Sequence, residues 1–245
     1  MKAGIWNIGS VLGASALLAG AIQLAPVAAQ GDGTPFQVDS FSQLQIEGGG
    51  HAIVTIGSPA SVTVSGPDSE ISNLQVQVWF NTLEIEPNND DNRSAGSDLV
   101  YHITVPTLTQ IQLEGSVTAE VDGLTTDSLQ LSIEDSAGIQ LTNLAAGRLD
   151  AQVEGSSSAT ISGSADSQQI ENEDSSTYDA LQLETGTIEI EAEGSSHSKI
   201  RFTDSLSGQI EDNSVVDYMT ESGNVSVSTE DSAQLNALPF EELAS

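Results

Sequence analysis

A period of about 20 residues, the length of one unit in many repeat architectures, runs through the second half of this sequence. In each copy an alternating apolar stretch ends in Glu, which is followed by Gly or Asp and then by a small polar residue. Such a repeat is typical of a solenoid, in which each unit stacks on the one before it. The copies begin at Glu114, Glu134, Glu154, Glu173, Glu193, Glu211 and Glu230, so that successive numbers differ by 20, 20, 19, 20, 18 and 19.

Apolar residues recur at every second position on both sides of each Glu. This period indicates strand rather than helix, and the Gly, Asp, Ser and Asn residues between the strands are typical of turns. We therefore expect an all-β solenoid whose apolar side chains point inward and whose coils of about 20 residues stack at roughly 4.8 Å. Asn172 takes one inward position, where we expect a hydrogen-bonded amide. Four apolar residues are predicted to line the interior: Ile133, Leu141, Val153 and Ile161.

Two segments before and within the repeat resemble a known family. The segment Ile103–Ser116 matches a valine-proline strand that leads into a first Gly-Ser turn. An earlier segment matches loosely an opening Phe-x-x-Ile-x-Val-x-Gly strand and hairpin, at Phe41, Leu44, Ile46, Gly48, Val54 and Ile56. Between about residues 36 and 238 the chain resembles the autotransporter adhesin head domain family, whose members are domains of unknown function. The resemblance implies a right-handed β-helix with capped ends, and it implies little about activity.

The N-terminus has the pattern of a secretory signal peptide. Lys2 precedes a long uncharged apolar stretch, and the small residues Val27, Ala28 and Ala29 follow it. A positive start, an apolar middle and a small-residue end predict cleavage ahead of Gln30, so that residues 1–29 are the signal peptide. An uncleaved membrane anchor is the alternative, because the stretch is long enough to span a bilayer. We predict an exported protein of the periplasm, the cell surface or the extracellular space.

The remaining chain is predicted to be one domain. Residues 30–35 are expected to be a linker, and residues 36–245 a single β-helix domain with regular repeats at about 108–235. The less regular strands of residues 36–106 are expected to form the first coils and to cover one end of the interior. The apolar residues of the tail, 236–245, are expected to cover the other end. Such caps are needed because an open solenoid end exposes apolar surface and unpaired strand edges.

The charge of the chain excludes several classes of partner. It has 36 acidic and 5 basic residues, a formal net charge of −31. Nucleic acids need basic surfaces, so we predict no nucleic-acid binding, and anionic membrane surfaces are disfavoured for the same reason. Cations, basic partners and a salty environment are compatible with such a surface. The chain has no Cys and therefore no disulfide.

Stacking of the repeats predicts a column of Glu beside a column of Asp that Gly interrupts. Two carboxylates at about 4.8 Å repel by about 3.5 kcal/mol at an effective dielectric constant of about 20. Salt, raised pKa values or bound cations could relieve this repulsion, and oxygen-only clusters suit Ca²⁺. We interpret the alternation of Asp with Gly as dilution of charge. No cofactor is predicted except Ca²⁺, whose candidate ligands are Glu134, Asp135, Glu173, Asp174, Glu211, Asp212, Glu230 and Asp231.

Two classes of function remain open. The first is a secreted or envelope, adhesin-like binding module without enzymatic activity, which contacts an unknown surface, glycan or protein through the flat sides of the solenoid. The second is a carbohydrate-active β-helix enzyme, of the polysaccharide lyase or glycoside hydrolase type, which would use a pair of carboxylates. The first is favoured because the most regular carboxylates belong to the repeat, so that no pair is singled out as catalytic.

Overall fold

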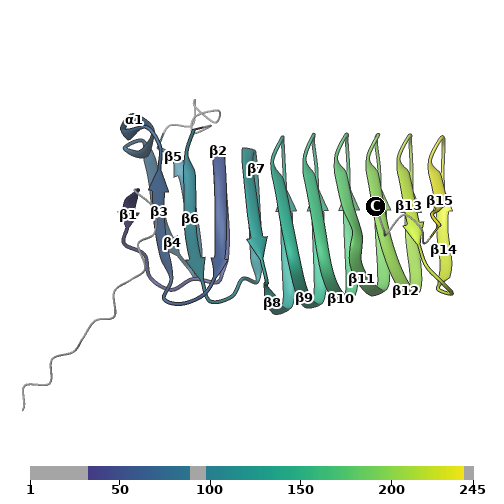
Figure 1. Cartoon of the computed structure of the whole chain (residues 1–245). Helices are drawn as coiled ribbons and strands as arrows, with labels where there is room; N and C mark the ends of the chain where they lie inside the picture. The colour runs from purple at the N-terminus through teal and green to yellow at the C-terminus, as the bar shows by residue number, and fades with distance from the viewer. Residues whose placement is uncertain (1–32, 89–97, 240–245) are drawn as a thin grey trace, which may run out of the picture.

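The computed structural model describes residues 33–88 and 98–239, and nearly all of their regular structure is β-strand. The strands form one sheet that winds into a solenoid, drawn from purple at the N-terminal end to yellow at the C-terminal end in Figure 1. The predicted all-β solenoid with coils of ~20 residues is confirmed. The predicted signal peptide, residues 1–29, lies outside the described residues, as do the start of the linker and the end of the tail.

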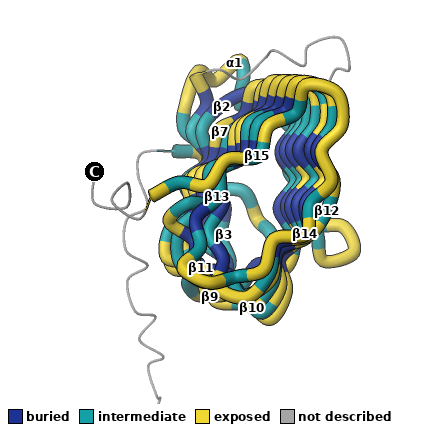
Figure 2. Tube along the Cα trace, turned by 90° about the vertical axis from the view of Figure 1, so that its right-hand side faces the viewer, coloured by how far each residue is buried: buried dark blue, intermediate teal, exposed yellow. Residues whose placement is uncertain are grey.

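The regular array consists of parallel strands, and each strand hydrogen-bonds with the strands of the coils before and after it. Viewed down the axis, successive coils superimpose, and their buried positions coincide (Figure 2). The strands are β7 (Gln110–Asp122), β8 (Thr125–Ile133), β9 (Gly138–Val153), β10 (Ser158–Asn172), β11 (Thr177–Ala192), β12 (His197–Ile210), β13 (Val215–Met219), β14 (Asn224–Thr229) and β15 (Gln234–Ala237).

The N-terminal end does not follow chain order. Strand β2 pairs in parallel with β7 on one side and with β5 and β6 on the other, so that residues later in the chain than β2 form the outer coil. Antiparallel strands β1, β3 and β4 pair with this part of the sheet. The elements are β1 (Thr34–Phe36), β2 (Gln43–Ile56), β3 (Ser61–Ser65), α1 (Asp68–Ile71), β4 (Leu74–Trp79), β5 (Thr82–Pro87) and β6 (Val100–Val105).

The first strand starts earlier than the sequence indicates. Thr34 and Pro35, which fall in the expected linker, belong to β1 and pair with Val64 and Thr63 of β3. The backbone pairing with β3 is a long-range contact, so local residue patterns do not reveal it. Among the described residues, no helix has the length and hydropathy needed to cross a membrane.

The interior of the solenoid is apolar, as expected. Ile133, Leu141 and Val153 are fully buried, and Ile161 is 1% exposed. These side chains alternate with outward polar ones, so each strand contributes one face to the interior and one to the surface. The prediction for these four residues is confirmed.

A hydrogen-bonded polar network lies within this interior. The amide nitrogen of Asn172, a fully buried residue, donates to Ser198 Oγ at 2.8 Å, and its Oδ1 accepts from Ser176 Oγ at 2.6 Å. The Tyr178 hydroxyl donates to Gln168 Oε1 at 2.5 Å, and burial raises the pKa of this tyrosine. The interior amide expected at Asn172 is therefore present, and its polar atoms are satisfied by nearby hydroxyl groups.

Backbone conformation explains why the corner after each Glu carries Asp or Gly. At the corner after each Glu, Asp135, Asp174 and Asp212 have φ values of 64°, 61° and 59°, and Gly155 and Gly194 have φ values of 75°. Gly and Asp are among the residues that best tolerate this left-handed region. A Cβ on Gly155 or Gly194 would lie 2.7 or 2.8 Å from the carbonyl oxygen of the Asp one coil earlier. Dilution of charge as the reason for the alternation of Asp with Gly stays a prediction.

A second corner shows the same alternation, which we did not predict. The register places Gly147 beside Asp127 and Asp166, and Gly186 beside Asp166 and Asp204. A Cβ on Gly147 or Gly186 would lie 2.6 or 2.7 Å from the carbonyl oxygen of the preceding Asp. A coil with Asp at one corner also has Asp at the other, and a coil with Gly at one corner has Gly at the other, so the two corners alternate together. The structural repeat of this region is therefore two coils rather than one.

Candidate functional site

One long side of the solenoid carries three columns of outward polar side chains, which together we call the polar face. The outer column lies four residues before each repeat Glu, and the middle column lies two residues before it. The repeat Glu residues themselves form the Glu column. Strand pairing fixes the outer column as Thr82, Gln43, Gln110, Gln130, Asp150, Gln169, Glu189, Ser207 and Ser226. It fixes the middle column as Glu84, Gln45, Gln112, Ser132, Gln152, Glu171, Glu191, Gln209 and Ser228.

The Glu column has one more member than the repeat in the sequence indicates. Glu47 of β2 lies directly beside Glu114 of β7, and Gly48 lies beside Gly115. The signal is visible as Glu-Gly-Gly at positions 47–49, but the next copy starts only at Glu114, because β3 to β6 are inserted between them. The repeat therefore begins in β2.

Hydrogen bonds connect the middle column to the Glu column within single strands. Each runs from an amide or hydroxyl to the carboxylate two positions later, where the charge of the acceptor strengthens the hydrogen bond. The pairs are Gln45 Nε2 to Glu47 Oε1 at 2.9 Å, Ser132 Oγ to Glu134 Oε1 at 2.9 Å, Gln152 Nε2 to Glu154 Oε1 at 2.7 Å, and Gln209 Nε2 to Glu211 Oε1.

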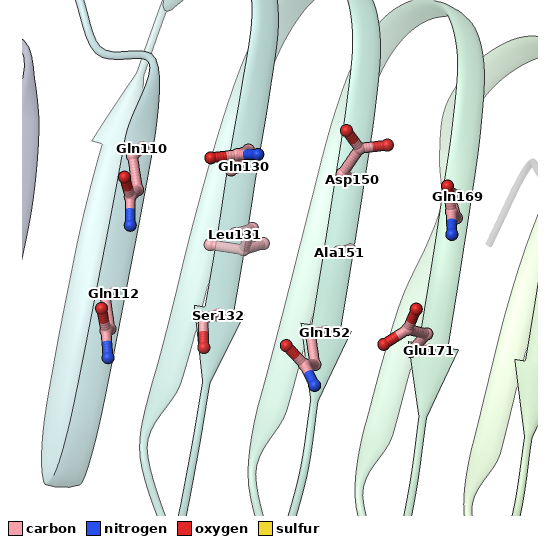
Figure 3. Close-up of a pocket in the computed structure, with 10 residues that line it drawn as sticks. All are labelled: Gln110, Gln112, Gln130, Leu131, Ser132, Asp150, Ala151, Gln152, Gln169 and Glu171. Atoms are coloured by element: carbon pink, nitrogen blue, oxygen red, sulfur yellow. The ribbon is translucent and has the colours of Figure 1, made fainter.

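A shallow groove of about 460 Å³ crosses the polar face (Figure 3). Its polar walls come from β7, β8, β9 and β10, and the buried residues Leu131 and Ala151 also line it. The side-chain amides of Gln110, Gln112 and Gln130 make no hydrogen bond to any other described residue, and we call them the free amides. Each of them can both donate to a ligand and accept from it. The remaining lining residues are Ser132, Asp150, Gln152, Gln169 and Glu171.

Arg148 restrains one of the two carboxylates that line the groove, Asp150. Its Nε lies 2.6 Å from Asp150 Oδ1, and its Nη2 donates to Gln169 Oε1 at 2.6 Å. The hydrogen bond with Asp150 and then the charge of Asp150 raise the pKa of the guanidinium. Asp150 is therefore paired with a permanent cation.

The eight candidate calcium ligands occupy two adjacent columns, as expected. The four Glu residues lie in the Glu column, and the four Asp residues lie at the neighbouring corner. The Asp174 and Asp212 carboxylates accept hydrogen bonds from the backbone N–H groups of Gly155 and Gly194, each at 3.2 Å. Within residues 33–88 and 98–239, no group of three or more His, Asp or Glu side chains is close enough to hold a metal ion. Calcium binding stays a prediction.

Screening and site binding of calcium have different consequences for thermal stability. If repulsion in the Glu column is screened, the Tm should rise smoothly with ionic strength, whatever the salt. If the columns hold Ca²⁺, the Tm should rise saturably at millimolar Ca²⁺ and fixed ionic strength. The double variant Asp135→Asn with Asp174→Asn should then lose that response, because Asn keeps the left-handed conformation but not the charge. A Tm that responds to neither NaCl nor CaCl₂ would contradict both accounts.

Two members of the Glu column have raised pKa values. Partial burial, followed by the charges of Glu154 and Glu193, raises the pKa of Glu173. Partial desolvation, followed by the charges of Glu230 and Glu193, raises the pKa of Glu211. The folded chain therefore disfavours the ionised form at these positions, which is the direction expected of stacked carboxylates.

We expect Glu173→Gln to raise the Tm at pH 7 and to leave it nearly unchanged at pH 4. The pKa of Glu173 is higher in the folded chain than the unfolded value of about 4.3. The folded state therefore binds more protons, and this contribution to stability is lost as the pH rises through the folded pKa. Melting curves at constant ionic strength measure the effect. Glu221→Gln, at an exposed bend outside the column, is the control, and an equal gain in both variants would refute the assignment to stacking.

The comparison with protein families agrees with the fold. The family model described as "Putative auto-transporter adhesin, head GIN domain" matches residues 40–236. This range includes every coil of the polar face. No protein of curated function matches the sequence significantly.

Several solved structures share the architecture. A "putative adhesin" from Bacteroides fragilis is similar with a TM-score of 0.78 and 20% identity, over 83% of this chain and 95% of that one. A "putative lipid binding protein" from Parabacteroides distasonis has a TM-score of 0.62 and 13% identity, over 85% and 98% of the two chains. A "putative adhesin" from Parabacteroides merdae has a TM-score of 0.60 and 12% identity, over 84% and 95%. At these identities the likeness concerns the fold alone.

Proposed function

The chain belongs to the family described as "Putative auto-transporter adhesin, head GIN domain", and we propose that it is a non-enzymatic binding module exposed on the cell envelope or outside the cell. Its contact surface is the polar face. The observation that carries this proposal is the groove, where the free amides of Gln110, Gln112 and Gln130 lie on adjacent strands of a flat, regularly spaced surface.

A glycan is the ligand class that this surface suits best. Gln side chains offer donors and acceptors together, which matches hydroxyl groups that also do both. The strands repeat at roughly 4.8 Å, so an extended polymer along the rod meets a similar set of polar groups at each step. Many weak contacts of this kind add up when one chain engages several of them. The net charge of −31 disfavours acidic polymers.

The arrangement of carboxylates supports binding rather than hydrolysis. Glycoside hydrolases use an isolated pair of carboxyl groups on either side of the scissile bond. Of the two carboxylates that line the groove, Asp150 is paired with Arg148, and Glu171 lies in the middle column beside Glu191. The other carboxylates of the polar face repeat from coil to coil, so none stands apart as an acid or a nucleophile.

The proposal predicts that a double variant, Gln112→Ala with Gln130→Ala, weakens glycan binding about tenfold. Each lost hydrogen bond costs about 0.5 to 1.5 kcal/mol, and about 1.4 kcal/mol is one factor of ten in affinity. A glycan array of the wild-type chain identifies the ligand, and titration of that ligand measures the loss. Gln140→Ala, on an exposed position of β9 outside the polar face, is the matched control. Equal weakening by the control, or release of new reducing ends, would contradict the proposal.

A further inference from the structure

Two aromatic side chains stand out on a surface that otherwise has few. Trp79 is 61% exposed and Phe80 is 84% exposed, and they are consecutive at the tip of the β4–β5 hairpin. Their ring centroids lie 4.8 Å apart at an interplanar angle of 78°, an edge-to-face pair. Aromatic residues make up only 4% of the chain. Exposed rings that pack on each other rather than on the interior call for a functional explanation.

The hairpin extends the polar face by one strand. Trp79 is paired directly with Thr82, and opposed residues of an antiparallel pair project on the same side of the sheet. Thr82 is in the outer column, and its hydroxyl donates to Gln43 Oε1 at 2.8 Å. The next pair on this side confirms the orientation, because Gln77 Nε2 donates to Glu84 Oε2 at 2.9 Å. Trp79 is therefore the terminal member of the outer column.

The backbone holds the tip in a fixed position. Phe80 and Asn81 have φ values of 43° and 74°, as a two-residue hairpin turn requires at both central positions. The Asn81 carbonyl oxygen accepts from the N–H groups of Ser42 and Gln43, each at 3.1 Å, and its amide donates to Ser42 Oγ at 2.7 Å. Asn suits such a turn, whereas a bulky residue such as Phe80 rarely adopts this conformation. Turn chemistry alone therefore does not account for an aromatic ring at this position.

The composition of the polar face changes along its length. Next to Trp79 the outer column consists of uncharged residues, first Thr82 and then Gln43, Gln110 and Gln130. Carboxylates enter this column only at Asp150, which Arg148 pairs. The aromatic tip and the free amides of the outer column therefore form one continuous uncharged track. Three strand spacings, roughly 14 Å, separate Trp79 from Gln110.

We infer that Trp79 and Phe80 form a stacking platform for a sugar ring, and that the ligand is a glycan without acidic groups whose chain continues along the outer column to Gln110 and Gln130. This inference rests on the proposed function of the polar face. The C–H groups of a pyranose face carry partial positive charge and are attracted to the negative face of an aromatic ring. The hydroxyls at the ring edges then reach the flanking Thr and Gln side chains, which donate to them and accept from them.

The test uses affinity electrophoresis of the full chain in gels that contain hydroxyethylcellulose, xylan or galactomannan, with polygalacturonate as an acidic probe. A Trp6→Phe background leaves Trp79 as the single tryptophan, so that its emission reports on the tip. We expect retardation and a blue-shifted Trp79 emission with an uncharged polysaccharide, and neither with polygalacturonate. Trp79→Ala should weaken binding about tenfold, and Trp79→Phe should retain most of it, because a ring is kept.

Phe80→Gly separates binding from stability. Gly adopts a positive φ without strain, so this variant should raise the Tm and yet weaken retardation severalfold. Loss of binding in Gln112→Ala with Gln130→Ala, but not in Trp79→Ala or Phe80→Gly, would overturn the platform and leave the proposed function in place. Absence of retardation by every uncharged polysaccharide would overturn both. A Trp79 emission shift with phosphatidylcholine vesicles instead of polysaccharides would identify the tip as a membrane contact and overturn the glycan assignment.

Discussion

Replacing Ile161 by Asp is expected to unfold the solenoid at room temperature. The side chain is 1% exposed and lies beside Leu141 of the preceding coil. An unpaired buried carboxylate costs several kcal/mol, which is a large share of the net stability of a typical domain, about 5–15 kcal/mol. Because each coil is stabilised mainly by its neighbours, a defect in the middle of the array weakens both halves.

Circular dichroism during thermal and urea unfolding measures this effect. Ile161→Val is the matched control, because it removes one methylene and should cost only about 0.5 to 1.5 kcal/mol. Unfolding of the Asp variant with retention of structure in the Val variant would locate the effect in the buried charge. A cooperative melt of Ile161→Asp at the wild-type temperature would show that this position faces solvent.

Gly208→Ala is expected to destabilise the chain by about 3 kcal/mol or more. Gly208 has a φ of 139°, and a Cβ at this position would lie 1.8 Å from the carbonyl oxygen of Ile190 in the adjacent strand. An unfavourable backbone conformation costs about 1 to 2 kcal/mol, and overpacking costs about 1 to 3 kcal/mol more. The clashing atom belongs to the backbone of a paired strand, so it cannot rotate away.

Gly57→Ala is the control for Gly208→Ala. A Cβ on Gly57 would make an ordinary contact of 3.5 Å with Thr104 Cγ2, and its backbone needs no left-handed conformation. This variant should therefore change the free energy of unfolding by less than about 1 kcal/mol. Urea denaturation of both variants measures the difference. Similar free energies for the two would mean that the strands around Gly208 are farther apart than described.

The parts of the fold that repeat could be predicted, because one register describes every coil. The interior positions of Ile133 and Ile161 follow from period two, and the buried amide of Asn172 follows from its place in the same register. The N-terminal end could not be derived in this way. Glu47 of β2 lies directly beside Glu114 of β7, although β3, β4, β5 and β6 separate these two strands in the sequence. Such pairing depends on distant segments, and local patterns do not encode it.

The candidate site was missed for a different reason. The Gln residues of the groove stand at fixed distances before each repeat Glu, so the columns were present in the sequence. Outward polar residues are expected on any strand that faces water, and only the stacked geometry distinguishes a continuous row of free amides. The position of Trp79 on the same face also required the pairing of β4 with β5. In contrast, the second Asp and Gly column, from Asp127 to Asp204, could have been found from the period alone.

The two-coil phase at the corners sets the step by which the alternating part of the rod can change in length without altering its corner contacts. Between Asp127 and Asp212, removal of a single coil would replace Asp–Gly contacts at both corners by Asp–Asp or Gly–Gly contacts, which the chain makes only outside this region, at Asp212–Asp231 and Gly48–Gly115. Removal of two coils, from one Asp corner to the next, would preserve every Asp–Gly contact between the new neighbours. Gene duplication or deletion in steps of two coils, each about 9.6 Å of rod, therefore leaves the corners intact. The reach of such a module is thus adjustable in discrete increments.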